Sequence, residues 1–187
     1  MVEIVGGHEQ SAADREEFVT QALRDYESSL LCYATTFLHD IERARDVVQD
    51  TFIRLYQQDI EKFKDGLKAW LFTVCRNRSL DVIRKEKRII GLEEEQVSRL
   101  PSTKRTPSER ADLLERVDQV HSALGRLSEN QREVILLKFE QGLSYDEISV
   151  VTGLSSGNVG FLLHTGLKRL RSFLPEDLLR NLTPQTA

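Results

Sequence analysis

Two stretches of the chain carry basic side chains in numbers that suit contact with a polyanion. Residues 76–88, RNRSLDVIRKEKR, contain six Arg or Lys and two acidic residues, and residues 155–171 contain three basic residues and none acidic. Residues 1–50 have the opposite balance, with 11 acidic and 4 basic side chains. Each Lys or Arg that neutralises a phosphate adds salt-dependent affinity. The pattern predicts nucleic-acid contact at two separate segments, although the net charge of the chain is −4.

The second basic stretch ends a predicted helix-turn-helix. The pattern predicts a short helix over 144–151, a turn at residues 152–153 and a second helix from about residue 155. Short polar side chains and apolar contacts read base edges, and the N–H groups at a helix N-terminus attract phosphate. The alternative is an ordinary helical bundle in which Phe161 packs against a neighbouring helix. The candidate DNA-contacting residues are Ser155, Ser156, Asn158, Phe161, His164, Thr165 and Lys168.

A regular apolar stripe over residues 44–55 predicts an amphipathic helix with an acidic reverse face. That face carries Glu42, Asp46, Gln49 and Ile53, with Asp50 on its flank. An exposed Ile among acidic side chains suits a basic partner surface that has an apolar centre. The alternative is a solvated acidic face on which Ile53 has no role.

Two aromatic residues, Phe63 and Trp70, flank a loop that contains Gly66. They can hold an unstacked base, because stacking on an aromatic side chain is worth roughly 1–3 kcal/mol per base. The alternative is that Trp70 belongs to the hydrophobic core of its domain. The spacing alone leaves both interpretations open.

The elements that position these residues are predicted to form an all-α fold of two small helical domains. Capping sequences mark helix starts at Ser11, Thr106, Ser128 and Ser144. No long alternation of apolar and polar residues and no hairpin turn predicts a strand. The helical pattern lapses over 89–105, which predicts a flexible linker. The N-terminal bundle is expected over 11–88 and the C-terminal helix-turn-helix domain over 106–174.

The apolar positions of the C-terminal domain predict its interior. One set suits the turn and the helix before it, and the other follows one face of the second helix at 3.6-residue spacing. Gly166 is expected to permit a close approach between two helices. The predicted interior residues are Leu143, Ile148, Val151, Leu154, Val159, Leu163, Gly166, Leu167 and Leu170.

The sequence also argues against several classes of function. It has no phosphate-binding Gly loop, nucleophile motif or metal-ligand spacing, so we expect neither an enzyme nor a metal or cofactor site. No run approaches the ~20 apolar residues of a membrane span, and the N-terminus shows no export signal. Cys32 and Cys75 are predicted to be buried thiols in a reducing compartment. We expect a cytoplasmic protein that makes no membrane contact of its own.

Taken together, three segments resemble the bacterial sigma factors of the extracytoplasmic-function (ECF) type. The segment DVVQDTFIRLY is similar to the family's region 2.2, and WLFTVCRNRSLDVIRKEKR is similar to its regions 2.3 and 2.4. The segment LSENQREVILLKFEQGLSYDEISVVTGLSSGNVGFLLHTGLKRLR is similar to region 4. The resemblance implies an alternative sigma factor that binds RNA polymerase core and directs promoter-specific transcription initiation. It implies no catalysis and no cofactor.

The resemblance also implies roles for residues at matching positions. Contact with the clamp helices of the largest polymerase subunit falls on Asp46, Gln49, Asp50 and Ile53. Contact with the −10 promoter element falls on Lys64, Asp65, Trp70, Arg76, Asn77, Arg78, Asp81, Arg84, Lys85 and Arg88. Contact with the −35 element falls on Ser155, Ser156, Asn158, Gly160, Phe161, His164, Thr165, Lys168 and Arg169. The polymerase flap and an anti-sigma factor are further implied partners.

The predicted recognition helix departs from the family pattern at four positions. Family members commonly carry a basic residue and Ser where this chain has Gly160 and Phe161, and often Arg where it has Leu162 and Thr165. The promoter sequence therefore does not transfer from relatives, and DNA binding by region 4 alone is expected to be weak. Attachment beside region 2 on the polymerase would raise its effective concentration at the DNA.

Two other functions stay open from the residues alone. A stand-alone helix-turn-helix transcriptional regulator with an N-terminal helical bundle would dimerise and bind a palindrome without polymerase. A helical adaptor that binds only proteins would leave the basic run 76–88 as a solvated face.

Overall fold

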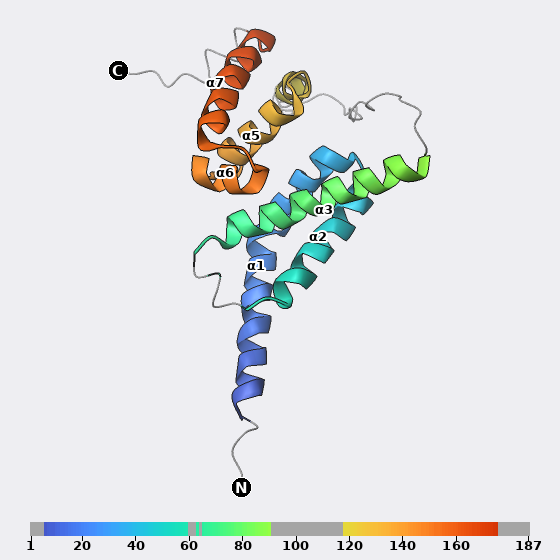
Figure 1. Cartoon of the computed structure of the whole chain (residues 1–187), viewed down its shortest axis with the longest axis vertical. Coiled ribbons are helices and arrows are strands. Elements are labelled where there is room, and N and C mark those ends of the chain that lie inside the picture. The colour runs from blue at the N-terminus through green and yellow to red at the C-terminus, as the bar shows by residue number, and fades with distance from the viewer. Residues whose placement is uncertain (1–5, 60–62, 64, 91–117, 176–187) are drawn as a thin grey trace, which may run out of the picture. The chain divides into compact units, whose positions relative to one another are not determined.

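The computed structural model describes residues 6–59, 63, 65–90 and 118–175, and within these ranges the chain forms helices and no strand. The chain divides into two compact units. The first contains helices α1, α2 and α3, and the second contains the helices that follow residue 118 (Figure 1). The prediction of an all-α fold is confirmed. None of the described helices combines the length and the apolar character that a membrane span requires.

The first unit consists of α1 (Gly6–Leu38), α2 (Ile41–Tyr56) and α3 (Leu67–Ile90). Each of the three helices packs against the other two. Its core is mainly aliphatic with a few aromatic rings: the ring of Tyr33 meets that of Phe72 edge to face, with centroids 5.1 Å apart. The predicted stripe of α2 is buried in full, as Ala44, Val47, Val48, Thr51, Phe52 and Leu55. Burial of this stripe turns the reverse face of α2 outward.

Local chemistry sets the ends of these helices. His39, which follows α1, adopts a left-handed φ of 52°, and its N–H donates to Thr35. Asp40 then caps α2, because its side chain accepts from the N–H groups of Glu42 and Arg43. Gly66 has φ 89°, a conformation that favours glycine, and its carbonyl accepts from the N–H of Trp70 at the start of α3.

Two sequence predictions for the first unit are wrong. The helix start at Ser11 is not seen, because α1 already begins at Gly6 and runs through that segment. No proline separates residue 6 from residue 11, and the single glycine between them, Gly7, does not end the helix. In addition, α3 extends to Ile90, so the first two residues of the predicted linker are helical. The rest of the linker and the predicted helix start at Thr106 lie outside the described residues.

The two cysteines differ in their surroundings. Cys75 is buried as predicted, and burial raises the pKa of its thiol to about 12, which keeps it protonated near neutral pH. Cys32 is exposed, so the prediction that it is buried is wrong. The buried positions of α1 nearby are Leu30, Tyr33 and Ala34. Successive helical residues are about 100° apart, and Cys32 falls on the opposite side of the helix.

The second unit contains a helical segment over 118–125, then α5 (Glu129–Phe139), α6 (Tyr145–Thr152) and α7 (Ser156–Phe173). The helix starts at Ser128 and Ser144 are confirmed, and Ser144 forms a complete capping box with Glu147. Gly153 ends α6 in the left-handed conformation, with φ 74°. The predicted helix, glycine turn and helix are therefore present as α6, Gly153 and α7.

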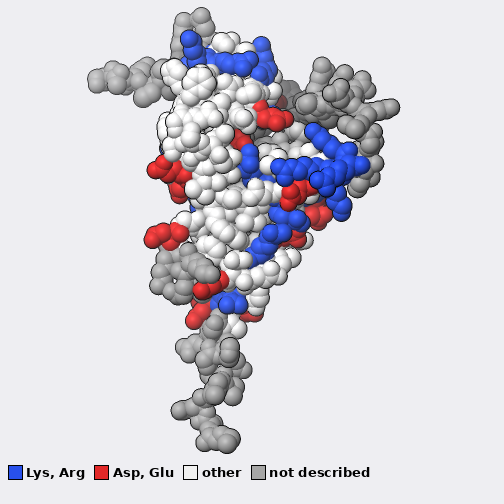
Figure 2. Space-filling model, viewed as in Figure 1, with Lys and Arg blue, Asp and Glu red and all other residues white. Residues whose placement is uncertain are grey.

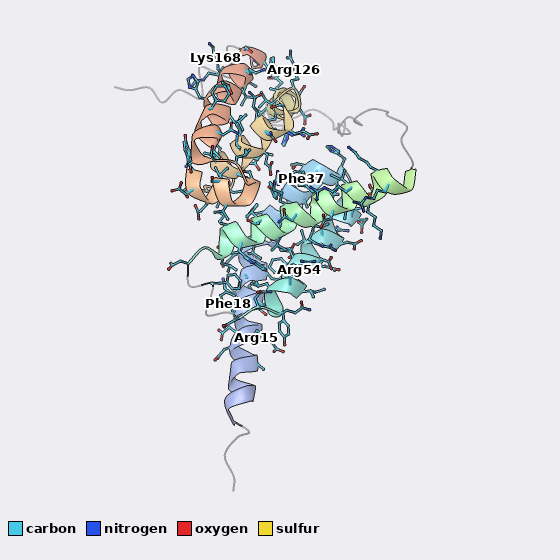
Figure 3. All side chains as sticks on the ribbon, in the orientation of Figure 1. Arg15, Phe18, Phe37, Arg54, Arg126 and Lys168 are labelled. Carbon is cyan, nitrogen blue, oxygen red and sulfur yellow. The ribbon has the colours of Figure 1, made fainter. Side chains whose placement is uncertain are left out.

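The interior of the second unit joins α5, α6 and α7. Leu143, Ile148, Val151, Val159 and Leu163 are buried as predicted, whereas Leu154, Leu167 and Leu170 are only half-buried. Gly166 lies on the buried face of α7, and a Cβ there would come within 3.0 Å of Ile135 Cδ1 on α5. Arg126 lies over the ring of Phe173, 3.8 Å from its centroid, and ties the segment 118–125 to the end of α7 (Figure 3).

Candidate functional site

The outward face of α2 carries the residues predicted to bind a protein partner. Asp46, Gln49 and Ile53 are exposed, and 56% of the Ile53 surface is accessible. At 100° per residue, Gln49 lies about 300° round the helix from Asp46, and Ile53 lies about 400° round from Gln49. The three side chains therefore share one face. Asp50 lies beside them and is half-buried. An apolar residue of this exposure among polar neighbours is consistent with a contact surface.

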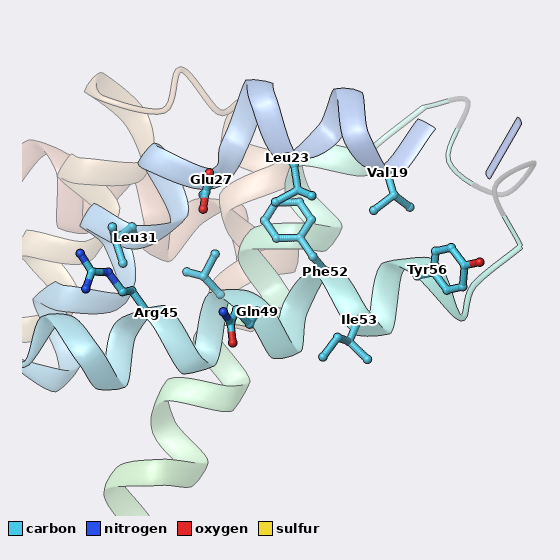
Figure 4. A pocket seen from close by; sticks show the side chains of 10 residues that line it. Val19, Leu23, Glu27, Leu31, Arg45, Gln49, Phe52, Ile53 and Tyr56 are labelled. Atoms are coloured by element: carbon cyan, nitrogen blue, oxygen red, sulfur yellow. The ribbon is translucent and has the colours of Figure 1, made fainter. Parts of the chain in front are cut away.

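An apolar groove runs beside this face, between α1 and α2, with a volume of about 490 Å³ (Figure 4). Val19, Leu23 and Leu31 line it from α1. Phe52, Ile53 and Tyr56 line it from α2, while Glu27, Arg45 and Gln49 lie toward its other end. Sequence reasoning missed the groove. Its signal was the apolar spacing of Val19 and Leu23, which lies on the same face of α1.

Asp50 is joined to α3 by an ion pair. Arg78 donates to Asp50 Oδ2 from both Nε, at 3.1 Å, and its Nη2. The pair lies at the surface of the unit, with 31% of the Arg78 side chain and 42% of the Asp50 side chain accessible. The sequence assigned these residues to different sites, and the structure brings them into direct contact.

The basic segment occupies the C-terminal half of α3, and Figure 2 shows Lys and Arg gathered over this part of the helix. Two acids offset part of its charge: Arg84 pairs with Asp81 at 3.2 Å, and Glu86 pairs with Arg43 of α2 at 2.9 Å. Asn77, Lys85, Lys87 and Arg88 are exposed, whereas Arg76 is half-buried. Lys85 and Arg88 are therefore predicted DNA-contacting cations that are exposed and that pair with no described acid.

The aromatic pair near the start of α3 agrees in part with both interpretations of Trp70, as a residue that stacks on an unpaired base and as a core residue. The rings of Phe63 and Trp70 are 5.0 Å apart and inclined at 60°, and Trp70 is half-buried. Trp70 also borders a hollow of about 460 Å³ that is rich in polar side chains, among them Asp50, Arg54, Gln57 and Gln58. Asp65 is exposed, and Lys64 lies outside the described residues.

The exposed face of α7 is largely uncharged through its first three turns. Asn158, Phe161 and His164 are exposed, and 63% of the Phe161 surface is accessible, so Phe161 does not pack as a core residue. Lys168 lies toward the C-terminal end of the helix (Figure 3). Gly160 is half-buried, and a Cβ there would meet the ring of Tyr145 at 3.5 Å.

Several polar groups of α7 already have partners within the unit. The Ser155 hydroxyl caps the helix by accepting from the N–H of Asn158. Thr165 Oγ1 accepts from Gln131 Nε2 at 3.1 Å and donates to the carbonyl of Phe161. Arg169 donates to Gln131 Oε1 at 3.4 Å. Thr165 and Arg169 are therefore tied to α5, and of the predicted readers Asn158, Phe161 and His164 face solvent most freely.

Sequence reasoning missed an acidic residue beside the start of α7. Ser156 Oγ donates to Asp146 Oδ1 at 2.7 Å, which places a carboxylate near the positive end of the helix. A carboxylate there opposes the phosphate that this N-terminus was predicted to attract. The signal was available, because Asp146 lies in the first turn of the predicted helix that precedes the turn.

The described residues contain no cluster of His, Cys, Asp or Glu that could hold a metal ion. The outward face of α2 with Asp46 and Ile53, the basic half of α3 and the exposed face of α7 are open surfaces, which are suited to binding macromolecules. Such surfaces gain affinity by charge complementarity and by apolar contact over an area.

Comparison with known proteins places both units in one family. Residues 22–89 match the family description "Sigma-70 region 2", and residues 118–170 match "Sigma-70, region 4". The chain is 33% identical over 170 residues to the ECF RNA polymerase sigma factor SigL of Mycobacterium tuberculosis, covering 88% of this chain and 94% of that protein. It is 30% identical over 165 residues to the ECF RNA polymerase sigma factor EcfG of Rhodopseudomonas palustris, covering 85% and 88%.

Two solved structures have a similar fold. The sigma factor RpoE of Bartonella quintana, in complex with the anti-sigma factor NepR, matches with a TM-score of 0.61 at 26% identity, covering 82% of this chain and 94% of that one. CnrH, in complex with the cytosolic domain of CnrY, matches with a TM-score of 0.58 at 25% identity, covering 93% and 95%.

Proposed function

The chain belongs to the ECF RNA polymerase sigma factors, which direct promoter-specific transcription without catalysis, and from this membership we propose which surface binds which partner. The acidic face of α2 binds the polymerase core, the basic half of α3 binds the −10 element and the exposed face of α7 binds the −35 element. The observation that carries this assignment is the separation of charge within the first unit. Acidic Asp46 and exposed Ile53 lie on α2, whereas exposed Lys85 and Arg88 lie on α3.

The polymerase contact proposed for α2 is with the clamp helices of the largest subunit. Ile53 supplies apolar area at the centre of the contact, and Asp46 and Gln49 supply charge and hydrogen bonds around it. Interfaces of this kind gain most of their energy from a few central residues. A contact with the polymerase flap is proposed for the second unit from family membership alone.

The DNA contacts proposed for the two units differ in kind. The exposed cations of α3 meet phosphates of the −10 element, and Trp70 with its neighbouring polar hollow suits an unstacked base. For the −35 element, the Asn158 side chain is suited to hydrogen bonding with a base edge, and the Phe161 ring is suited to contact with a thymine methyl group. The proposed surface of α7 further includes Ser155, Ser156, Gly160, His164 and Lys168. Thr165 and Arg169 also belong to it and are hydrogen-bonded to Gln131 of α5.

An anti-sigma factor is the proposed regulatory partner. The support is that the RpoE and CnrH structures are complexes, in the first case with a named anti-sigma factor. A sigma factor and its polymerase share one compartment, so we also propose that the chain acts in the cytoplasm. A stand-alone helix-turn-helix regulator is not favoured, because the family matches cover both units. The first unit, which matches sigma-70 region 2, would have no polymerase to bind in such a regulator.

The proposed function is tested by run-off transcription with purified polymerase core on genomic fragments, with and without this protein. We expect defined transcripts that depend on the protein. A chain that neither binds core nor changes the transcripts would contradict the proposal.

A matched pair of variants tests the polymerase contact itself. Ile53→Glu places a charge at the centre of the proposed contact, and we expect core affinity to fall at least about tenfold, as for an interface hot spot. Ile41→Glu makes the same chemical change at another exposed position of α2, about 120° round the helix. We expect it to leave core affinity within about twofold. Equal losses in both variants would argue against the assignment of this face.

A further inference from the structure

The ion pair between Asp50 and Arg78 connects two surfaces to which we have assigned different partners. Asp50 belongs to the polymerase-binding face of α2, and Arg78 belongs to the DNA-binding helix α3. Two other ion pairs described in this unit do not connect proposed surfaces in this way: Arg84 and Asp81 lie on the same helix, and neither Arg43 nor Glu86 lies in a proposed contact. The inference that follows rests on the proposed function.

The geometry prevents Arg78 and Asp50 from binding their proposed partners at full strength while the ion pair between them is intact. Arg78 directs Nε and Nη2 at one carboxylate oxygen, and these are two of the donors that an Arg uses to bind a phosphate in bidentate fashion. The same donors cannot serve Asp50 and a phosphate together at full strength. One carboxylate oxygen of Asp50 accepts from Arg78, and the positive charge of Arg78 lowers the attraction of Asp50 for a cation of the polymerase. Both side chains are partly accessible, so either partner can reach the pair.

We propose that the Asp50–Arg78 pair couples polymerase binding to promoter binding, and that it restrains both in the free chain. When the polymerase engages Asp50, Arg78 is released for DNA, and when DNA engages Arg78, Asp50 is released for the polymerase. The pair has to be broken once for two binding events, so each event favours the other by the same factor. Exposed and partly exposed pairs contribute modestly, which sets that factor at about 1.5- to 5-fold.

The first test measures the affinity of the full chain for polymerase core. Arg78→Gln frees Asp50 and is expected to raise this affinity by about two- to fivefold. The matched control is Arg24→Gln, which removes one positive charge from an exposed position of α1 that lies in neither proposed contact. We expect the control to stay within about 1.5-fold of the unchanged chain.

The second test measures binding of the free chain to single-stranded DNA at low salt. Asp50→Asn frees Arg78, so affinity is expected to rise by about two- to fivefold, and the slope of log K against log salt to steepen by about 0.7. Asp25→Asn removes an acid from α1 that accepts from Gln21 and holds no arginine. It reports the effect of net charge alone and is expected to leave the slope unchanged.

A double variant separates coupling from unrelated changes of charge. In Asp50→Asn, the further change Arg78→Gln has no carboxylate to release, so its gain in core affinity is expected to vanish. If the unchanged chain binds core and supports run-off transcription but Arg78→Gln and Arg24→Gln have equal core affinity, the coupling is refuted and the proposed function stands. If the unchanged chain does not bind core, the proposed function fails, and the coupling fails with it.

Discussion

The two units of this sigma factor differ in the charge of the surfaces that we propose for DNA. In region 2, exposed cations gather along the C-terminal half of α3, and Figure 2 shows Lys and Arg gathered there with Asp and Glu beside them. In region 4, α7 has no Lys or Arg before Lys168, and a carboxylate, Asp146, lies at its start. Under the proposed assignment, region 2 therefore supplies most of the non-specific attraction to DNA, whereas the free face of region 4 offers side chains that suit recognition of bases.

This difference explains how a recognition helix with little charge can serve in a sigma factor. A helix that binds by charge holds any DNA, and its grip carries little sequence information. A helix with few cations binds weakly everywhere, but attachment to the polymerase beside region 2 keeps its effective concentration high. On this proposal, the weak attraction costs little affinity in the complex, and we expect Asn158 and Phe161 to discriminate between bases.

The largest expected effect comes from reversing the charge of region 2. The double substitution Lys85→Glu and Arg88→Glu changes two exposed side chains that pair with no described acid. We expect promoter-dependent run-off transcription to fall by about ten- to a hundredfold and the salt slope of DNA binding to shrink by about 1.5, because two phosphate contacts are lost. Core affinity, measured in the same preparations, is the control. Transcription at the original level would show that α3 does not bind the promoter.

The next effect distinguishes the two units by stability. Gly166→Ala forces a Cβ to 3.0 Å from Ile135 and 3.3 Å from Gln131, so we expect region 4 to lose about 1–3 kcal/mol of unfolding free energy. Gly160→Ala meets only the Tyr145 ring at 3.5 Å and is expected to stabilise α7 by about 0.5–1 kcal/mol. Urea unfolding followed by circular dichroism reports the helices of both units.

The fluorescence of Trp70 supplies the control for that experiment. Trp70 is the one tryptophan of the chain and belongs to region 2, so its transition reports that unit. We expect it to be unchanged in both glycine variants. A shift of the Trp70 transition by Gly166→Ala would mean that the two units unfold together, which would weaken the contrast between them.

A smaller effect is expected from the apolar reader of region 4. Phe161→Ala removes a side chain that is mostly exposed, so the stability of the unit should change little. We expect affinity of the holoenzyme for its −35 element to fall about fivefold, equivalent to about 1 kcal/mol, the lower end of the range for one base contact. The salt slope is expected to stay constant, in contrast with the charge reversal in α3. A steeper or shallower slope would show that Phe161 acts through phosphate contacts.

The smallest effect concerns the carboxylate at the start of α7. Asp146→Asn keeps an oxygen that can accept from Ser156 but removes the negative charge. We expect promoter affinity to rise by about two- to fivefold, since a charge near a helix end is worth about 0.3–1 kcal/mol. Competition assays with holoenzyme at low salt measure this change. A fall in affinity would indicate that Asp146 is needed to hold the N-terminal turn of α7 in place.

Much of this architecture could be predicted because it depends on local chemistry. The apolar stripe of α2, the caps at Ser128 and Ser144 and the turn at Gly153 are each encoded within a few neighbouring residues, and all are present. Gly166 could be predicted to lie at a close approach because an interior glycine on an apolar face has few other uses.

The parts that were missed depend on contacts between distant residues. The pairing of Asp50 with Arg78 joins positions 28 residues apart, and Gln131 reaches Thr165 across 34. The periodicity of the sequence predicts which face of its helix a residue occupies, but it does not predict which residue of another helix will contact it. Cys32 was misjudged for a simpler reason, because a small apolar residue in a long helix gives no indication of its side when its neighbours are mixed.

One side chain of α5 fixes the orientation of α7, the helix that we propose for the −35 element. The amide of Gln131 holds Thr165 with its nitrogen and Arg169 with its oxygen, one turn apart. The rotation of α7 about its own axis is thereby fixed from α5, and with it the directions in which Asn158 and Phe161 point. If α7 binds the −35 element as we propose, substitutions at Gln131, which is buried, are expected to change promoter preference.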